Sequence, residues 1–222
     1  MKLQYLGDAK DSFKWDYHDY LVDSLGYRSL NLVLMMTPDD GGSHGSSNAS
    51  LYPARENVIQ FCQALSRSRD LSRLRNLPIA TSANYSVDVH SDDYLQSVEK
   101  RHEYFNGFCS EIDQVVLVDP DNGLEPQKSF SEKHLLYSEL NQVLMQVTEE
   151  SVVSVFQHFR RKPFEKDFLE ISKRILSGYS TAVYWHSLMF VLVTRSFDVH
   201  NRLVSVNEAY ASEQPVNVIT NA

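Results

Sequence analysis

An acidic cluster follows directly on a run of β-branched residues in the middle of the chain. Residues 114–125 read QVVLVDPDNGLE, which places Asp119, Asp121, Asn122 and Glu125 just beyond a predicted buried strand. Carboxylate and amide oxygens at such a position can hold a substrate amine by hydrogen bonds, or coordinate a hard cation such as Mg²⁺. The same residues are also good turn formers, because Asx side chains bond to nearby backbone and Gly accepts a positive φ. The cluster alone leaves a turn and a functional site both open.

A second polar cluster follows another apolar run, LNLVLMM at 30–36. It combines two carboxylates with three glycines, namely Asp39, Asp40, Gly41, Gly42 and Gly45. The carboxyl ends of parallel strands meet at one edge of a sheet, where ligands bind. If both runs are parallel strands, the two acidic loops should therefore meet at one crevice. His158 follows a third strand-like run, SVVSVFQH, and could line the same crevice.

The elements that would position these residues alternate along the chain. Strands are predicted from short apolar runs, at 30–36, 114–118, 151–158, 181–186 and 188–194, with a weaker candidate at 79–87. Helices are predicted from apolar residues at helical spacing, at 11–25, from about 53, from about 91, over 136–147 and after Pro163. This alternation predicts an α/β fold, a Rossmann-like, doubly wound and mostly parallel sheet with helices on both faces. We expect one domain over 1–212 and a flexible tail over 213–222.

Composition limits the classes of partner. The 222 residues carry a formal net charge of −8, which argues against a protein that coats nucleic acid or anionic membrane by bulk electrostatics. A local basic patch could still serve a nucleic acid or nucleotide substrate. The cysteines, Cys62 and Cys109, suggest neither a disulfide framework nor a thiolate metal site, and we find no signal peptide and no run of ~18 apolar residues. A cytoplasmic protein without membrane contact is expected, while the oligomeric state stays open.

Several stretches carry a family resemblance. LGDAKDSFKWDYHDYLVDSL, LNLVLMMTPDDGGSHG, QVVLVDPDNGLE and SVVSVFQHFRRK follow one another in the order typical of class I S-adenosylmethionine (SAM)-dependent methyltransferases. The chain most resembles the branch that contains the large-subunit ribosomal RNA adenine-N6 methyltransferases and the three-Cys-motif partner proteins. It is also similar to a group of uncharacterised bacterial and mobile-element proteins that share the LGD, TPDDG and DPDNG motifs.

The resemblance implies roles for particular residues. Asp11 and Lys14 match the family's Asp-x-x-Lys, and Asp119 with Pro120 matches the start of its catalytic Asp-Pro-Pro-aromatic sequence. By this match Lys14, Gly41, Gly42 and Gly45 would bind SAM, and we expect the neighbouring Asp39 and Asp40 to join them. From their positions at the strand ends, we expect Asp119, Asp121, Asn122 and His158 to be catalytic and Arg160 and Arg161 to contact a substrate phosphate. Asp121 and Asn122 depart from the family's second proline and aromatic residue, which puts adenine-N6 transfer in question.

Two further hypotheses use the same residues differently. In the first, Asp39, Asp119, Asp121 and Glu125 bind Mg²⁺ in a phosphodiesterase or nuclease, and nearby basic residues address the phosphate. In the second, the fold has no catalytic activity and serves as a binding module in a phage or defence system. Binding of SAM, of a divalent metal ion or of neither separates the three hypotheses.

Overall fold

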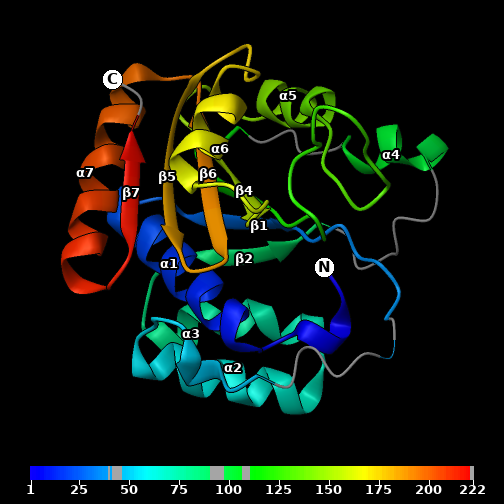
Figure 1. Cartoon of the computed structure of the whole chain (residues 1–222). Helices are drawn as coiled ribbons and strands as arrows, with labels where there is room; N and C mark the ends of the chain where they lie inside the picture. Colours follow the sequence, from blue (N-terminus) through cyan, green and yellow to red (C-terminus); the bar gives the residue numbers. More distant parts are fainter. Residues whose placement is uncertain (40, 42–46, 91–97, 107–110, 221–222) are drawn as a thin grey trace.

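The computed structural model of the chain describes residues 1–39, 41, 47–90, 98–106 and 111–220. Within these residues, a seven-stranded sheet with the order β2-β1-β3-β4-β6-β5-β7 forms the centre of the molecule (Figure 1). The strands are β1 (Ser29–Val33), β2 (Ser86–Val89), β3 (Val115–Val118), β4 (Val152–His158), β5 (Tyr179–Trp185), β6 (Leu188–Thr194) and β7 (Asn217–Thr220).

The sheet is parallel through its first four strands. β1 pairs in parallel with β2 and with β3, and β3 pairs in parallel with β4. β6 is antiparallel to β4, and β5 and β7 continue the sheet with antiparallel pairs. The α/β, Rossmann-like prediction is confirmed, with parallel pairing through β2, β1, β3 and β4 and antiparallel pairing beyond them.

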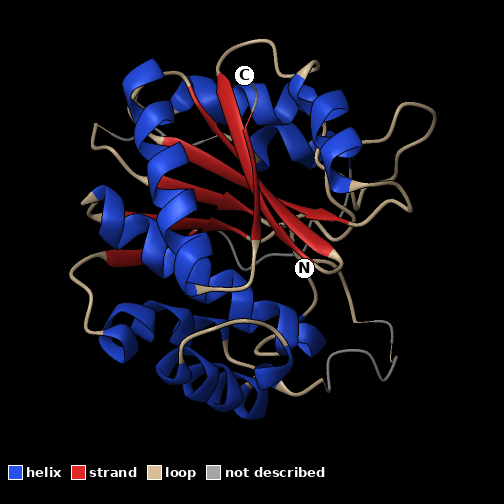
Figure 2. Cartoon of the chain, turned by 60° about the vertical axis from the view of Figure 1, so that its left-hand side comes forward, coloured by secondary structure: helices blue, strands red, loops and turns tan. Residues whose placement is uncertain are grey.

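Helices cover both faces of this sheet, as Figure 2 shows. The longer ones are α1 (Ala9–Leu25), α2 (Glu56–Ser68), α4 (Val98–Tyr104), α5 (Tyr137–Gln146), α6 (Phe164–Ser172) and α7 (Phe197–Glu213), with a short α3 (Leu77–Thr81). Side chains of α1, α2, α3 and α7 share one apolar core with one face of the sheet. α5 and α6 build the other core. No helix in the described part of the chain is long and apolar enough to cross a bilayer.

Helix α1 is buried on nearly all sides and nevertheless carries many charged residues. Asp16 and Asp19 have almost no exposed surface, and Arg55 pairs with both at 2.6 and 2.7 Å. Such a helix shows no apolar stripe, because its buried polar groups are satisfied by partners from other elements. α1 can therefore run through the interior and bring charged side chains to the sheet edge.

The structure differs from the sequence-based expectations at several element boundaries. Residues 217–220 form β7 against β5, so the loose tail predicted for 213–222 is wrong over this stretch. The weak strand candidate at 79–87 divides, because 79–81 belong to α3 and only Ser86 onward forms β2. The strand predicted at 30–36 ends at Val33, and Met35 has a positive φ of 40°.

Candidate functional site

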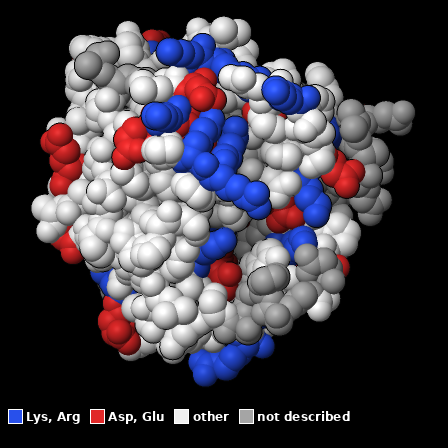
Figure 3. All heavy atoms as spheres, in the orientation of Figure 1, with Lys and Arg blue, Asp and Glu red and all other residues white. Residues whose placement is uncertain are grey.

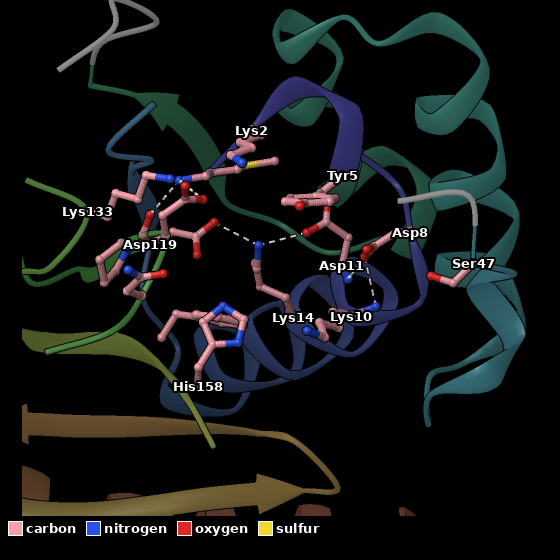
Figure 4. A pocket seen from close by; sticks show the side chains of 15 residues that line it. Lys2, Tyr5, Asp8, Lys10, Asp11, Lys14, Ser47, Asp119, Lys133 and His158 are labelled. Carbon is pink, nitrogen blue, oxygen red and sulfur yellow. Dashed lines mark hydrogen bonds and ion pairs between the residues drawn. The ribbon is translucent and has the colours of Figure 1, made fainter. Parts of the chain in front are cut away.

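A cavity of about 580 Å³ lies at the carboxyl ends of β3 and β4, and we call it the first cavity (Figure 4). Its lining comes from five parts of the chain. The start of the chain and α1 contribute Met1, Lys2, Tyr5, Asp8, Lys10, Asp11 and Lys14; the segment after β3 contributes Asp119, Pro120, Asp121 and Asn122; Ser47, Lys133, Phe156 and His158 complete it. The volume suits a ligand the size of a nucleoside.

The strand order explains why a hollow forms here. From β1 the chain moves to β2 on one side, and it later returns to place β3 on the other side of β1. The connection after β1 thus leads to one side of the sheet and the connection after β3 leads to the other. Their divergence opens a crevice between the two strand ends, which is where α/β proteins bind ligands. The amide of Asp119 donates to the Val33 carbonyl at 2.8 Å, so the two strand ends are tied together beside the cavity.

A buried group of three charges forms the wall of the cavity. Lys14 Nζ lies 2.7 Å from Asp11 Oδ1 and 2.7 Å from Asp119 Oδ2, and all three side chains are almost completely buried. Burial disfavours the charge of Lys14, yet Asp11 and Asp119 outweigh this effect and hold its pKa above the ordinary value. Lys14 is therefore an ammonium at neutral pH and neutralises much of the negative charge of the two carboxylates.

The start of α1 is built by Asp8 and Gly7. Asp8 Oδ1 accepts from the amides of Lys10 and Asp11 at 2.9 and 3.0 Å, which is an amino-terminal cap. The Gly7 amide donates back to Asp11 Oδ2 at 2.8 Å. Gly7 has a φ of 78°, and a Cβ there would lie 2.2 Å from the Cys62 carbonyl oxygen. Only glycine allows this close approach to α2, which sets the position of the helix that carries Lys14.

Asp8 has an unusual acidity. Burial raises its pKa to about 6, and repulsion from Asp11 adds to the effect. A carboxylate with a pKa near neutrality can take up and release a proton under ordinary conditions.

Asp121 lies on the opposite side of the cavity, close to the start of the chain. Asp121 Oδ1 is 3.4 Å from the Met1 amino nitrogen, and Oδ2 accepts from Thr37 Oγ1 at 2.7 Å. Burial opposes its ionisation, but the Met1 ammonium and the Thr37 hydroxyl outweigh burial and lower the pKa of Asp121. The Met1 amino group also donates to the carbonyls of Leu34 and Met35 at 3.1 and 3.0 Å. These carbonyls, just after β1, thus form an acceptor site for an amino group.

His158 ends β4 and contributes a neutral ring. Burial lowers its pKa to about 4, and the positive charge of Lys10 acts in the same direction. The ring packs edge-on against Phe156 at 4.6 Å between centroids. At neutral pH the imidazole is uncharged, so it can accept a hydrogen bond from a ligand.

The predicted site residues divide into four groups. Lys14, Asp119, Asp121, Asn122 and His158 line the first cavity, as does Asp11. Asp39 and Gly41 are exposed and do not line it, and the Asp39 carboxylate accepts from the Gln4 amide at 3.1 Å. Asp40, Gly42 and Gly45 lie outside the described residues.

The remaining predicted residues lie elsewhere. Arg160 faces a different cavity, Arg161 is exposed, and Glu125 accepts from the Tyr137 amide and pairs with Arg174. In the described part of the chain no three His, Cys, Asp or Glu residues are arranged to hold a metal ion. The four proposed Mg²⁺ ligands are separated for a physical reason: Asp119 faces Lys14, Asp121 faces the Met1 amino group and Glu125 faces Arg174.

Several lining residues were not predicted from the sequence as site residues: Lys2, Tyr5, Asp8, Lys10, Ser47 and Phe156. Asp8 had a usable signal, because an Asp directly before a helix is a typical cap. Lys10 had no such signal, since a single lysine near the start of a helix is usually an exposed surface residue. Only the position of α1 against the sheet edge brings these side chains into the cavity.

Comparison with known proteins finds similarity among solved structures. No protein-family model matches the chain, and a search of curated proteins finds no match. Among solved structures, the chain is similar to human methyltransferase-like protein 13 in complex with SAH. The two share 12% sequence identity with a TM-score of 0.39, over 92% of this chain and 90% of that chain.

Proposed function

We propose that the chain is a SAM-dependent methyltransferase that acts on nucleic acid or a nucleotide-containing substrate in the first cavity. The observation that carries this proposal is the ion pair between Lys14 and Asp119 at 2.7 Å. These residues belong to the two motifs that match the family, and they meet at the sheet edge where the strand order reverses. Two motifs that are distant in sequence thus contribute to one ligand-sized cavity.

One group beside the cavity could serve SAM. The carbonyls of Leu34 and Met35 accept from the buried amino group of Met1, which lines the cavity, and the methionine part of SAM also carries an amino group. If Met1 moved aside, these carbonyls could accept from the amino group of SAM. When bound, SAM supplies an activated methyl group, so the protein's main task is to align donor and acceptor.

The cavity's own residues can then be given roles. Asn122 and Asp119 border the same space and could hold an acceptor amine by hydrogen bonds. Asp8, with a pKa of about 6, could take the proton that the acceptor nitrogen releases. The neutral ring of His158 could accept a hydrogen bond from the substrate without adding charge.

Four lysines and four carboxylates line the cavity. Asp11 and Asp119 pair with Lys14, and Asp121 pairs with the Met1 amino group. Lys10 and Lys133 make no ion pair with any described residue. These two lysines could therefore contact the phosphate of a nucleotide-containing substrate.

A binding module without catalysis is the second candidate. It is favoured by the ion pair itself, because an Asp119 carboxylate held by Lys14 has less capacity left for a substrate amine. The Asp121 and Asn122 departures from the family sequence point the same way. Mg²⁺-dependent hydrolysis has less support, since the described carboxylates do not gather around one point.

Thermal unfolding with SAM, SAH or Mg²⁺ tests the proposal. A ligand at about 100 times its Kd adds about 2.7 kcal/mol of stability, which such a measurement detects. We expect stabilisation by SAM and SAH that Asp119→Asn reduces and that Asp88→Asn, at an exposed position of β2, leaves intact. Transfer of a labelled methyl group to nucleic acid or nucleotides would then separate an enzyme from a binding module. Stabilisation by Mg²⁺ alone would overturn the proposal.

A further inference from the structure

A second cavity, of about 360 Å³, lies between α6 and the segment 126–128. Four basic side chains line it, namely Lys128, Arg160, Lys162 and Arg174, together with two carboxylates, Asp167 and Glu170. Glu125 pairs with Arg174 at 3.4 Å, which leaves four positive against three negative charges. Figure 3 shows Lys and Arg side chains gathered on this face of the molecule, in a band that leads towards a hollow. The excess is local, since the chain carries a net charge of −8.

The carboxylates are concentrated on one of the cations. Lys162 Nζ lies 2.6 Å from Glu170 Oε2 and 3.0 Å from Asp167 Oδ1. Arg160 Nε is 3.8 Å from the other Asp167 oxygen, a weak contact, and Lys128 makes no ion pair with any described residue. A network that served only to fasten α6 would balance its cations more evenly. Here the positive charge of Arg160 and Lys128 is largely uncompensated.

Two guanidinium groups are held in fixed orientations. Arg160 Nη2 donates to the Gln157 side chain at 2.8 Å and also to the Leu124 carbonyl. The Arg174 guanidinium lies 3.9 Å from the centre of the Tyr137 ring and donates to the Glu125 carbonyl at 3.1 Å. Arginines that are already ordered lose little conformational freedom when they bind, and their planar donors match the oxygens of a phosphate group.

We propose that this second cavity is a phosphate-binding site, in which Arg160, Arg174 and Lys128 contact the anion. The class of ligand follows from the charge excess, from two oriented guanidinium groups and from an exposed lysine. The family resemblance and the composition of the sequence assign neither Arg174 nor Lys128 to a binding site. Compared with the sequence-based prediction, Arg160 keeps a role in phosphate binding but in a different cavity.

The side chain of Gln157 connects Arg160 of the second cavity to the segment that follows the lining of the first. Its Oε1 accepts from the Leu124 amide at 2.9 Å and from Arg160 at 2.8 Å. Leu124 continues the DPDNG segment that lines the first cavity. A phosphate on Arg160 could therefore belong to the substrate whose reacting end lies in the first cavity. This assignment rests on the proposed function, whereas the phosphate site itself rests on its own contacts.

Isothermal titration with sodium pyrophosphate, without SAM and at constant ionic strength, tests the site. We expect saturable binding to the wild-type chain, weakened about tenfold in Arg174→Gln because a charge-assisted contact is lost. Lys128→Gln should weaken binding several-fold, and its exposed position keeps it informative if Arg174→Gln fails to fold. Lys166→Gln is the matched control, since Lys166 is exposed on α6 and lines neither cavity.

Three results would overturn the phosphate site: no saturable binding to the wild-type chain, equal weakening in Lys166→Gln, or weakening by Lys133→Gln but not by Arg174→Gln. A short oligothymidylate forms a second arm. If the same substitutions weaken it, the phosphate comes from a nucleic acid backbone; if only pyrophosphate responds, it comes from a small phosphorylated molecule. If the chain binds pyrophosphate but not SAM, the phosphate site is supported and the proposed function is refuted. If the chain binds SAM but not pyrophosphate, the proposed function is supported and the phosphate site is refuted.

Discussion

Lys14 Nζ lies 2.7 Å from Asp119 Oδ2, although 105 residues separate the two along the chain. The contact joins α1 to the end of β3 with almost no exposure to water. Asp11 completes the group, so one ammonium serves two buried carboxylates. This arrangement makes Lys14 a structural requirement of the cavity as well as a candidate binding residue.

Replacing Lys14 should destabilise the fold strongly. Lys14→Met leaves Asp11 and Asp119 buried without a counter-charge, which costs about 3–5 kcal/mol. Urea unfolding at neutral pH measures this loss, with Lys166→Met as an exposed control. Equal losses in the two variants would contradict the role of Lys14.

Asp8 should lower stability at neutral pH. Its pKa in the folded state is about 6 against an ordinary value of 3.8, so the folded state binds more protons between these values. The penalty for the ionised form is complete above about pH 6 and disappears as the pH falls towards 3.8. Asp8→Asn keeps a capping oxygen and removes the charge, and it should stabilise the chain by about 1–2 kcal/mol at neutral pH.

The control for Asp8 is Asp70→Asn, because Asp70 is an exposed cap that accepts from the Ser72 amide at 2.9 Å. The pKa of Asp70 is lowered by its hydrogen bonds to Ser72, so its neutralisation should bring no gain. Chemical unfolding of both variants at neutral and at acid pH makes the comparison. A loss of stability in Asp8→Asn at neutral pH would show that the Asp8 charge is needed.

Two histidines should remain neutral far below their ordinary titration range. Burial lowers the pKa of His18 and of His158 to about 4 in each case. A depressed histidine pKa means that stability is lost as the pH falls from about 6.5 towards 4. NMR titration of the ring protons checks this, with His18→Gln and His158→Gln to assign the signals. A midpoint near 6.5 for either ring would contradict its burial.

Gly7 should tolerate no side chain. In Gly7→Ala the new Cβ would lie 2.2 Å from the Cys62 carbonyl oxygen and 2.6 Å from the Ser66 nitrogen. Because φ is also positive there, we expect a loss of about 2–5 kcal/mol. Gly26→Ala is the matched control: its φ is 70°, yet nothing lies within 4 Å of the added Cβ. Gly26→Ala should cost only about 1 kcal/mol. Similar unfolding midpoints for the two variants would argue against the close contact.

The main strands and helices were predictable because their signals are local. The run VVLV at 115–118 is β-branched, apolar and followed by turn residues, and it forms β3. The end of α1 at Gly26 was equally clear, because a left-handed residue is needed there and glycine supplies it. β7 was missed for the opposite reason. Its four residues, NVIT, carry little pattern of their own, and pairing with the open edge of β5 makes them a strand.

For the candidate site, the sequence by itself determined which polar residues follow the strands and that Asp119, Asp121, Asn122 and His158 should share one edge. Only the tertiary structure decided what those residues can do. It placed Lys14 against Asp119, turned Asp39 and Glu125 to other partners, and moved Arg160 to the second cavity. The physical reason is that residue types and element ends are local properties of the chain. Charge pairing, burial and pKa depend instead on distances between elements that only the packed fold sets.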